Sequence, residues 1–194
     1  MLISVWNLKG GTGKTSLTYS LVNDLDGYYI TNDTYNSVVS NVYNKVIKEL
    51  NEEIINSNTV VFDGGGFFDD TIKQVLQHSQ KIIIPLEPDL NSLNSLTNFL
   101  EELQKINNNI IFVINKVENN KTSIKDFETT KNFLIEEYKI NEKNIFKLSN
   151  SRIFKNIFEE EKGIKELVNS SKINKYRYKK IYEEYKKILE NVIN

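Results

Sequence analysis

Residues 7–16 read Asn-Leu-Lys-Gly-Gly-Thr-Gly-Lys-Thr-Ser and separate an apolar run at residues 2–6 from a helical pattern at residues 16–25. Glycines free the backbone of side-chain bulk, so that successive N–H groups can turn inward and surround an anion. The helix that follows presents the positive end of its dipole to the same point. This segment therefore predicts a strand, a phosphate-binding loop and a helix, the opening unit of an α/β fold.

The loop also carries the side chains that a nucleotide and its metal ion need. Lys14 is placed to reach the β- and γ-phosphates, and Thr15 begins the helix with a hydroxyl group that can bind Mg²⁺. The plain motif G-x-x-x-x-G-K-[ST] does not match, because Leu8 stands five positions before Gly13. The residues predicted to hold the nucleotide in this loop are Lys9, Gly10, Gly11, Thr12, Gly13, Lys14, Thr15 and Ser16.

The additional lysine, Lys9, gives the loop a family resemblance. The string from Asn7 to Ser16 closely resembles the deviant Walker A box of the ParA/MinD ATPases, whose signature is this first lysine. The resemblance implies ATP or ADP with Mg²⁺ as cofactors. It also implies a homodimer that closes on ATP, in which Lys9 crosses to the partner's nucleotide like an arginine finger. Lys9 and Lys14 are thus expected to serve catalysis.

Composition limits the class of protein without naming a partner. The 194 residues have a net charge of −1, 39% hydrophobic residues and no cysteine. This length predicts one domain over residues 1–194, and the lack of cysteine excludes disulfides, thiolate metal sites and iron–sulfur clusters. No apolar run reaches the roughly 18 residues that a membrane span requires, and no signal peptide precedes the loop, so a cytoplasmic location is expected.

Six short apolar runs alternate with helical patterns along the chain. They cover residues 2–6, 28–31, 59–62, 81–85, 110–114 and 144–148. Strands that are apolar nearly throughout are covered on both faces, which predicts a doubly wound α/β fold with a mostly parallel sheet flanked by helices, as in P-loop NTPases. Ligands of such sheets bind at the carboxyl ends of the strands, where the loops after residues 6, 62 and 114 are expected to meet.

Asp63 ends the third apolar run and matches the Walker B position. There a carboxylate holds Mg²⁺ through a water molecule. An aspartate at the end of a strand can also simply form a turn or cap a helix, but the phosphate loop favours the metal-binding interpretation. Three glycines, residues 64–66, follow where the family commonly has a small residue and prolines. They either approach the γ-phosphate closely or form a loose switch.

The segment after the second apolar run departs from the family pattern. Residues 31–35 read Thr-Asn-Asp-Thr-Tyr where the family usually shows Asp-x-Asp-Pro-Gln. The resemblance gives Asp33 the task of orienting or activating the attacking water, and a carboxylate near the γ-phosphate can do so. The alternative for Asp33 is an Asx turn. Thr31 replaces the first aspartate, so slow hydrolysis is expected.

Two later residues are candidates for contacts with ligands. Asn115 follows the fifth apolar run and is expected to read the adenine edge, because a carboxamide both donates and accepts hydrogen bonds. Its alternative is capping the next turn. Arg152 matches a basic residue late in the family and is either a DNA contact or an ordinary helix-start arginine. His78, the only histidine, is given no role.

The carboxyl-terminal segment predicts an amphipathic helix over residues 172–193. Its apolar side carries Ile181, Tyr182, Tyr185, Ile188, Leu189 and Val192, and residues 172–194 hold seven basic and three acidic side chains. Three interpretations compete: packing on the core with a solvated basic face, the same packing with DNA phosphates bound, and a helix on a membrane surface. Tyrosines and isoleucines suit packing on protein, so DNA ranks above membrane.

The leading hypothesis is a short ParA-like ATPase that dimerises on ATP, binds DNA non-specifically and associates with the nucleoid. A small DNA-binding partition partner would stimulate hydrolysis, so that plasmid or chromosomal DNA is segregated or positioned. No amino-terminal helix-turn-helix domain is expected before a loop at residue 7. The alternatives are a MinD-like positioning ATPase on a membrane surface and a bacterial tyrosine kinase. Tyr176, Tyr178, Tyr182 and Tyr185 favour the kinase, but Lys9 argues against it.

Overall fold

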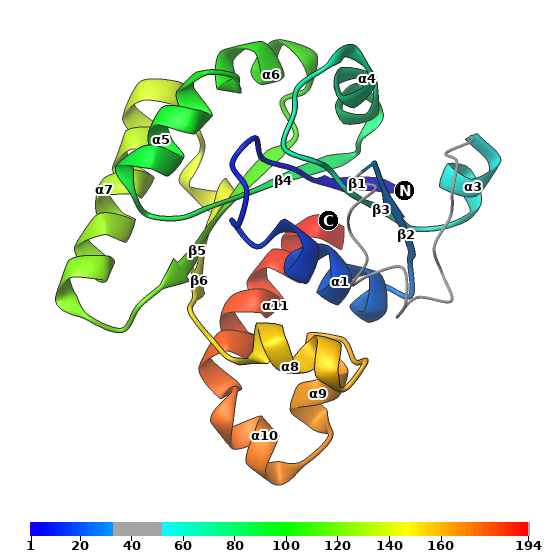
Figure 1. Cartoon of the computed structure of the whole chain (residues 1–194), viewed down its shortest axis with the longest axis vertical. Coiled ribbons are helices and arrows are strands. Elements are labelled where there is room, and N and C mark those ends of the chain that lie inside the picture. Colours follow the sequence, from blue (N-terminus) through cyan, green and yellow to red (C-terminus); the bar gives the residue numbers. More distant parts are fainter. Residues whose placement is uncertain (33–51, 194) are drawn as a thin grey trace.

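Six nearly apolar strands form one sheet in the computed structural model, which describes residues 1–32 and 52–193 (Figure 1). The strands are β1 (Leu2–Val5), β2 (Tyr28–Thr31), β3 (Val60–Asp63), β4 (Lys81–Leu86), β5 (Ile110–Val117) and β6 (Ile145–Ser149). Their order is β2-β3-β1-β4-β5-β6, and every neighbouring pair is parallel. The predicted fold class is confirmed, with a sheet that is parallel throughout the described residues. The order reverses at β1, which places a crevice at its carboxyl end.

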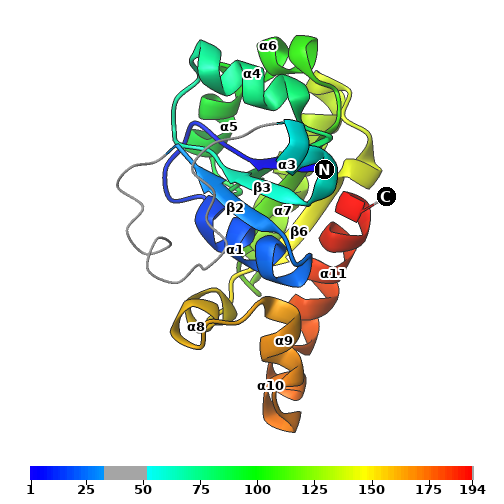
Figure 2. The same ribbon diagram turned by 90° about the vertical axis from the view of Figure 1, so that its right-hand side faces the viewer.

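Helices cover both faces of this sheet (Figures 1 and 2). In residues 1–32 and 52–193 they are α1 (Lys14–Asp24), α3 (Glu52–Ser57), α4 (Asp70–His78), α5 (Leu90–Thr97), α6 (Leu100–Ile106), α7 (Lys121–Tyr138), α8 (Ile153–Glu159), α9 (Ile164–Asn169), α10 (Lys172–Arg177), α11 (Lys179–Ile193) and the 3-10 helix η1 (Glu142–Asn144).

Alternate residues of each strand feed two separate hydrophobic cores. In β4, Ile83 joins the core under α1, α8, α9 and α11, whereas Ile82 and Ile84 join the core under α4 to α7. All three side chains are fully buried. This two-sided burial is the physical reason why the strands show no polar alternation in the sequence.

The carboxyl-terminal segment forms two helices, α10 and α11, rather than the single helix predicted over residues 172–193. The break lies at Tyr178, whose backbone leaves helical geometry with φ −104° and ψ 9°. The ring of Tyr178 is buried, and its hydroxyl oxygen accepts a hydrogen bond from the Asn156 side-chain amide at 2.8 Å. The partner on α8 is distant in sequence, so helical periodicity alone gave no sign of this break.

Helix α11 packs on the sheet with its apolar face buried, as the first of the three interpretations proposed. Ile181, Tyr185, Ile188 and Val192 are at most 4% exposed. Glu184 of α11 accepts hydrogen bonds from the Ser149 N–H at 2.7 Å and from the Ser149 hydroxyl at 2.9 Å, which ties the helix to the end of β6. Among the described residues, no helix has the length and apolar character needed to cross a membrane.

Shortening the fully buried Ile188 should destabilise the protein, because it removes apolar contacts and leaves a cavity between α11 and the sheet. We expect Ile188→Ala to lower the free energy of unfolding by about 2 to 4 kcal/mol, measured by urea denaturation. The matched control is Lys187→Ala, a change at the exposed neighbour. Equal stability of the two variants would contradict the packing described for α11.

Candidate functional site

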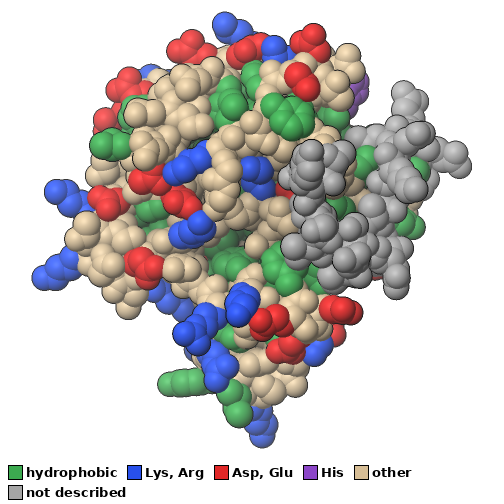
Figure 3. Space-filling model, in the orientation of Figure 1, with side chains coloured by type: hydrophobic (Ala, Val, Ile, Leu, Met, Phe, Trp, Pro, Cys, Tyr) green, Lys and Arg blue, Asp and Glu red, His purple; other side chains and the backbone are tan. Residues whose placement is uncertain are grey.

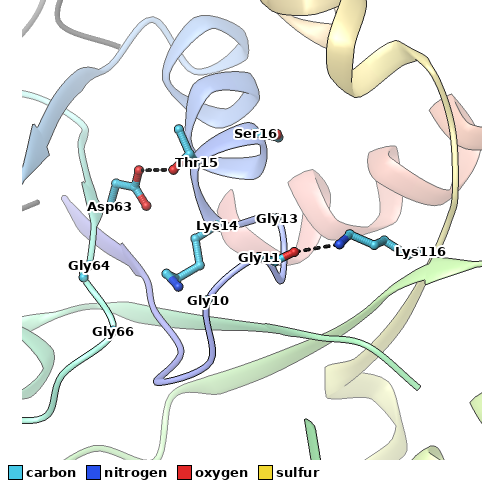
Figure 4. A pocket seen from close by; sticks show the side chains of 11 residues that line it. Gly10, Gly11, Gly13, Lys14, Thr15, Ser16, Asp63, Gly64, Gly66 and Lys116 are labelled. Atoms are coloured by element: carbon cyan, nitrogen blue, oxygen red, sulfur yellow. Dashed lines mark hydrogen bonds between the residues drawn. The ribbon is translucent and has the colours of Figure 1, made fainter. Parts of the chain in front are cut away.

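A pocket of about 470 Å³ lies where β1, β3 and β5 end and α1 begins (Figure 4). It is lined by Gly10, Gly11, Gly13, Lys14, Thr15, Ser16, Asp63, Gly64, Gly65, Gly66 and Lys116. The structure thus brings together the loop after β1, the Walker B candidate and the glycines that follow it, as expected for loops at the carboxyl ends of parallel strands. The Lys14 ammonium points into the space that they enclose.

The loop depends on glycine at two positions. Gly11 and Gly13 have φ values of +75° and +96°, a region that residues with a Cβ rarely adopt. A Cβ on Gly13 would also lie 2.4 Å from the Asn115 side-chain nitrogen. The backbone path around the pocket is therefore set by the glycine positions of the motif.

Asn115, near the end of β5, is hydrogen-bonded to the backbone of this loop. Its side-chain nitrogen donates to the Thr12 carbonyl at 2.9 Å, and its side-chain oxygen accepts from the Lys116 N–H at 2.8 Å. The residue is 6% exposed. Reading of the base by Asn115 stays a prediction, and in this structure both ends of the carboxamide are bonded within the chain.

The Asp63 carboxylate is the centre of the site's hydrogen bonding. Its Oδ2 atom accepts from the Thr15 hydroxyl at 2.7 Å and from the Tyr29 hydroxyl at 2.8 Å, and the residue is 3% exposed. Asp63 and Thr15 point toward each other from β3 and α1 at the pocket wall (Figure 4). A hydroxyl and a carboxylate side by side are hard oxygen ligands, so these residues fit Mg²⁺.

Tyr29 is a site residue that sequence reasoning missed. It lies on β2 opposite Val61 of β3, two residues before Thr31, which pairs with Asp63. The long side chain spans those two residues beneath α1 and reaches the Asp63 carboxylate, and it is 1% exposed. The sequence did contain one indication of this role: a tyrosine, with its polar hydroxyl, stands in a buried strand where an aliphatic residue would be enough to fill the core. Thr31 donates its hydroxyl to the Asp63 carbonyl at 2.8 Å and so ties β2 to β3.

Lys9 is held by its own chain in this structure. Its ammonium donates to both oxygens of Asp89, at 3.2 and 3.0 Å, and to the Ser92 hydroxyl at 2.8 Å. Glu87 lies 4.0 Å away. Burial alone would raise the pKa of Asp89, but hydrogen bonds from the Ser92 N–H and the Lys9 ammonium hold it below its usual value. Asp89 is thus a charged anchor for Lys9 that the sequence did not reveal.

Lys116 lines the pocket on the side of β5. Strand β5 runs beyond Ile114, with a register irregularity between Ile114 and Val117, and Lys116 adopts a φ of +57° there. Its ammonium donates to the Gly11 carbonyl at 2.7 Å and pairs with Glu87 at 2.5 Å. Glu87 therefore faces both Lys9 and Lys116. Lys14, the third cation here, donates to the Lys9 carbonyl at 3.0 Å.

Two of the three glycines after Asp63, Gly64 and Gly66, pack closely against the segment that follows β1. A Cβ on Gly64 would lie 2.6 Å from the Trp6 ring, and one on Gly66 would lie 2.7 Å from the Leu8 carbonyl oxygen. The Gly65 N–H donates to the Asn32 side chain at 2.8 Å. These contacts are all within the chain, and an approach of the glycines to the γ-phosphate stays a prediction.

The remaining candidates lie elsewhere. Asp33 falls outside the described residues. His78 ends α4, is exposed, and its Nδ1 atom lies 2.8 Å from the Gln74 carbonyl oxygen. Arg152 precedes α8 and lines a separate pocket with Arg177.

Comparison with known proteins gives similarity of structure only. No protein-family model matches the chain, and no curated protein matches its sequence. Three solved structures are similar over nearly the whole of both chains. Apo McdA from Cyanothece has a TM-score of 0.72 at 12% identity, covering 100% of this chain and 99% of its own.

A putative plasmid partition protein from Borrelia burgdorferi B31 bound to AMPPNP has a TM-score of 0.64 at 17% identity, with coverages of 99% and 97%. The MinD cell division protein from Aquifex aeolicus has a TM-score of 0.67 at 14% identity, with coverages of 99% and 96%. The chain therefore has the fold of ParA/MinD-type ATPases. The resemblance drawn from the loop is confirmed at the level of the fold.

Removing the Tyr29 hydroxyl should weaken metal-dependent nucleotide binding, because the Asp63 carboxylate loses one of the donors that orient it. A hydrogen bond to a charged group contributes about 1.5 to 3 kcal/mol, so we expect Tyr29→Phe to lower the apparent Mg²⁺ affinity by about tenfold or more. Titrating Mg²⁺ against labelled ATP would measure this, and binding in EDTA should not change.

The control is Tyr19→Phe. Tyr19 is as buried as Tyr29 and belongs to the same core, where its ring packs on Phe158. An equal Mg²⁺ response of the two variants would show that the Tyr29 hydroxyl serves only the core.

Proposed function

We propose that this chain is a Mg²⁺-dependent ATPase of the ParA/MinD type, which pairs on ATP and positions DNA. The observation that carries the proposal is one pocket that contains a glycine loop, Lys14 and the bonded Thr15–Asp63 pair, with a second lysine, Lys9, beside it. Membership of this class rests on the loop resemblance and on the shared fold.

The pocket supports ATP and Mg²⁺ as ligands. Lys14 is placed to transfer its hydrogen bond from the Lys9 carbonyl to the β- and γ-phosphates. Thr15 and Asp63 would hold Mg²⁺, which when bound neutralises charge on the phosphate oxygens. Among the proteins of similar fold, the Borrelia partition protein was solved with AMPPNP, which agrees with a nucleotide here.

Lys9 supports pairing on the nucleotide. Lys9 directly precedes the lining residue Gly10, and its ammonium is held by the carboxylate of Asp89, from which it would move to the nucleotide of a second copy. A cation supplied in trans stabilises the charge that develops on a transferring phosphoryl group. Asp33 would hold the attacking water, and with Thr31 in place of the family's first aspartate we expect hydrolysis to be slow without a partner.

The arginines support non-specific DNA binding. Arg152 and Arg177 are the only two arginines of the sequence, and both line one pocket of about 610 Å³. Its other lining residues are Asn150, Ser151, Asn156 and Tyr178. Neither arginine has an ion pair within the described part of the chain, and the planar guanidinium group suits phosphate oxygens. Lys and Arg side chains gather in this part of the surface (Figure 3).

The two alternative functions find less support. A MinD-like membrane helix would need the apolar face of α11, and that face is buried against the core. A tyrosine kinase would need an accessible cluster of terminal tyrosines, but Tyr178 and Tyr185 are at most 4% exposed, which leaves Tyr176 as the one exposed member of the four. The favoured partner is therefore DNA, with a small DNA-binding partition protein to supply site specificity and to stimulate hydrolysis in the cytoplasm, on the nucleoid.

The two loop lysines should separate nucleotide binding from pairing. Lys14→Ala removes the phosphate contact, so we expect ATP affinity to fall by about 100-fold or more in calorimetric titration. Lys9→Ala should bind ATP nearly as the wild type does, but remain monomeric when sized by light scattering with ATP and Mg²⁺. Lys125→Ala, at an exposed position on α7, is the control. A nucleotide-dependent dimer of Lys9→Ala would contradict the trans contact.

Asp33→Ala should leave ATP binding intact and stop turnover, since the attacking water loses its acceptor. We expect phosphate release to drop by about 100-fold and the ATP-bound dimer to accumulate, as measured by single-turnover hydrolysis and by sizing. Wild-type turnover in this variant would remove Asp33 from catalysis.

The two arginines should set the salt dependence of DNA binding. Each phosphate contact contributes about −0.9 to the slope of log affinity against log salt for duplex DNA. We expect Arg152→Ala and Arg177→Ala each to flatten that slope by roughly one contact, measured by anisotropy of labelled duplex in the presence of ATP. Lys125→Ala should keep the wild-type slope, and unchanged slopes in both arginine variants would place DNA on another surface.

A further inference from the structure

Helix α10 lies at the end of the molecule opposite the upper helices α4 and α6, beyond α8 and α9 (Figures 1 and 2). With α9 and α11 it encloses a groove of about 430 Å³. The groove is lined mainly by Val168, Lys172, Lys175, Tyr176, Lys179 and Tyr182. Arg177, on another side of the same helix, belongs to the arginine pocket instead.

Burial in the core does not explain the apolar side chains of α10. None of the residues of α10 is buried. Its two large apolar side chains, Ile173 and Tyr176, are 68% and 89% exposed. Across residues 1–32 and 52–193 only four other large apolar side chains are exposed, at 42% to 76%, and they lie far apart in the sequence. Ile173 and Tyr176 both belong to one six-residue helix, beside a groove that is also lined by the buried Val168. Together they form an exposed apolar surface of the kind that binds a partner.

The rim of the groove is positively charged. Lys172, Lys175 and Tyr176 come from α10 and Lys179 begins α11, and all four side chains line the groove. All three lysines are exposed, and none has an ion pair within the described part of the chain. Glu183 is the only acidic residue that lines the groove. The surface thus combines an apolar floor with unpaired cations.

This combination decides between possible occupants. Duplex DNA would satisfy the lysines but has no apolar side chains to fill the floor. A bilayer binds helices that separate their apolar face from their cations, whereas here Tyr176 and the lysines line the same groove. A peptide with acidic and apolar side chains satisfies both, by laying its apolar side into the groove and its carboxylates along the rim.

We infer that the α9–α10–α11 groove is the docking site for an acidic, amphipathic peptide segment of a partner protein. The inference rests on surface residues remote from the phosphate loop, so it stands whether or not the pocket beside α1 hydrolyses ATP. Tyr176 is the apolar anchor of the interaction, and Lys172, Lys175 and Lys179 select for negative charge.

The test is selection from a display library of random peptides on the full-length protein, followed by anisotropy with the enriched peptides. We expect enrichment of sequences with Asp or Glu and with Leu, Phe or Trp at helical spacing. The double variant Lys175→Glu with Tyr176→Ser should bind them at least about tenfold more weakly than the wild type. Both substituted residues are exposed, so the fold should survive, as circular dichroism and ATP binding would verify.

The matched control is Ile124→Ser with Lys125→Glu, an exposed apolar residue and its neighbouring lysine on α7. This variant should bind the selected peptides as tightly as the wild type does. The inference is overturned if the selected peptides are basic or uncharged, if both double variants bind them equally, or if no selected peptide depends on α10. It is also overturned if only labelled duplex DNA or phosphatidylglycerol vesicles lose affinity in the α10 variant.

Discussion

One buried carboxylate, that of Asp63, joins the parts of the molecule that make the site. Through Oδ2 it links β3 to the start of α1 by the Thr15 hydroxyl and to β2 by the Tyr29 hydroxyl. A carboxylate that is 3% exposed must be hydrogen-bonded, because an unpaired buried charge costs several kcal/mol. The need to satisfy Asp63 therefore fixes where the loop helix sits on the sheet. The same geometry leaves the carboxylate oriented at the pocket wall before any ligand binds.

Lys9, unlike the buried Asp63, is held by a contact that is specific in geometry but weak in energy. Its ion pair with Asp89 joins side chains that are 27% and 38% exposed. Pairs of this exposure contribute about 0 to 1 kcal/mol. The contact defines where the ammonium lies, yet its loss would hardly affect stability. A phosphate of a second copy could therefore compete for Lys9, whereas no comparable competition would displace Thr15 from Asp63.

The sequence predicted what local pattern controls and missed what distant contacts control. The strands, the loop, the glycines and the position of Asp63 follow from apolar runs and from the φ values that only glycine adopts readily. Tyr29 depends on the register between β2 and β3, and Asp89 on where the turn after β4 meets the loop, so neither could be read from its neighbours. The helix break at Tyr178 is associated with Asn156 on another helix. Asp33, whose role came from resemblance alone, lies outside the described residues.

The phosphate loop and the carboxyl-terminal helices are joined by an unbroken series of contacts. Asn115 holds the Thr12 carbonyl, β5 pairs with β6, and Ser149 at the end of β6 is bonded to Glu184 of α11, which leads to α10. Such a path couples two sites only if one of its members has two arrangements. The structure shows one arrangement: Asn115 donates one amide hydrogen to Thr12, and its second amide hydrogen could serve a base without breaking that bond. Base recognition by Asn115 would therefore leave this series of contacts intact.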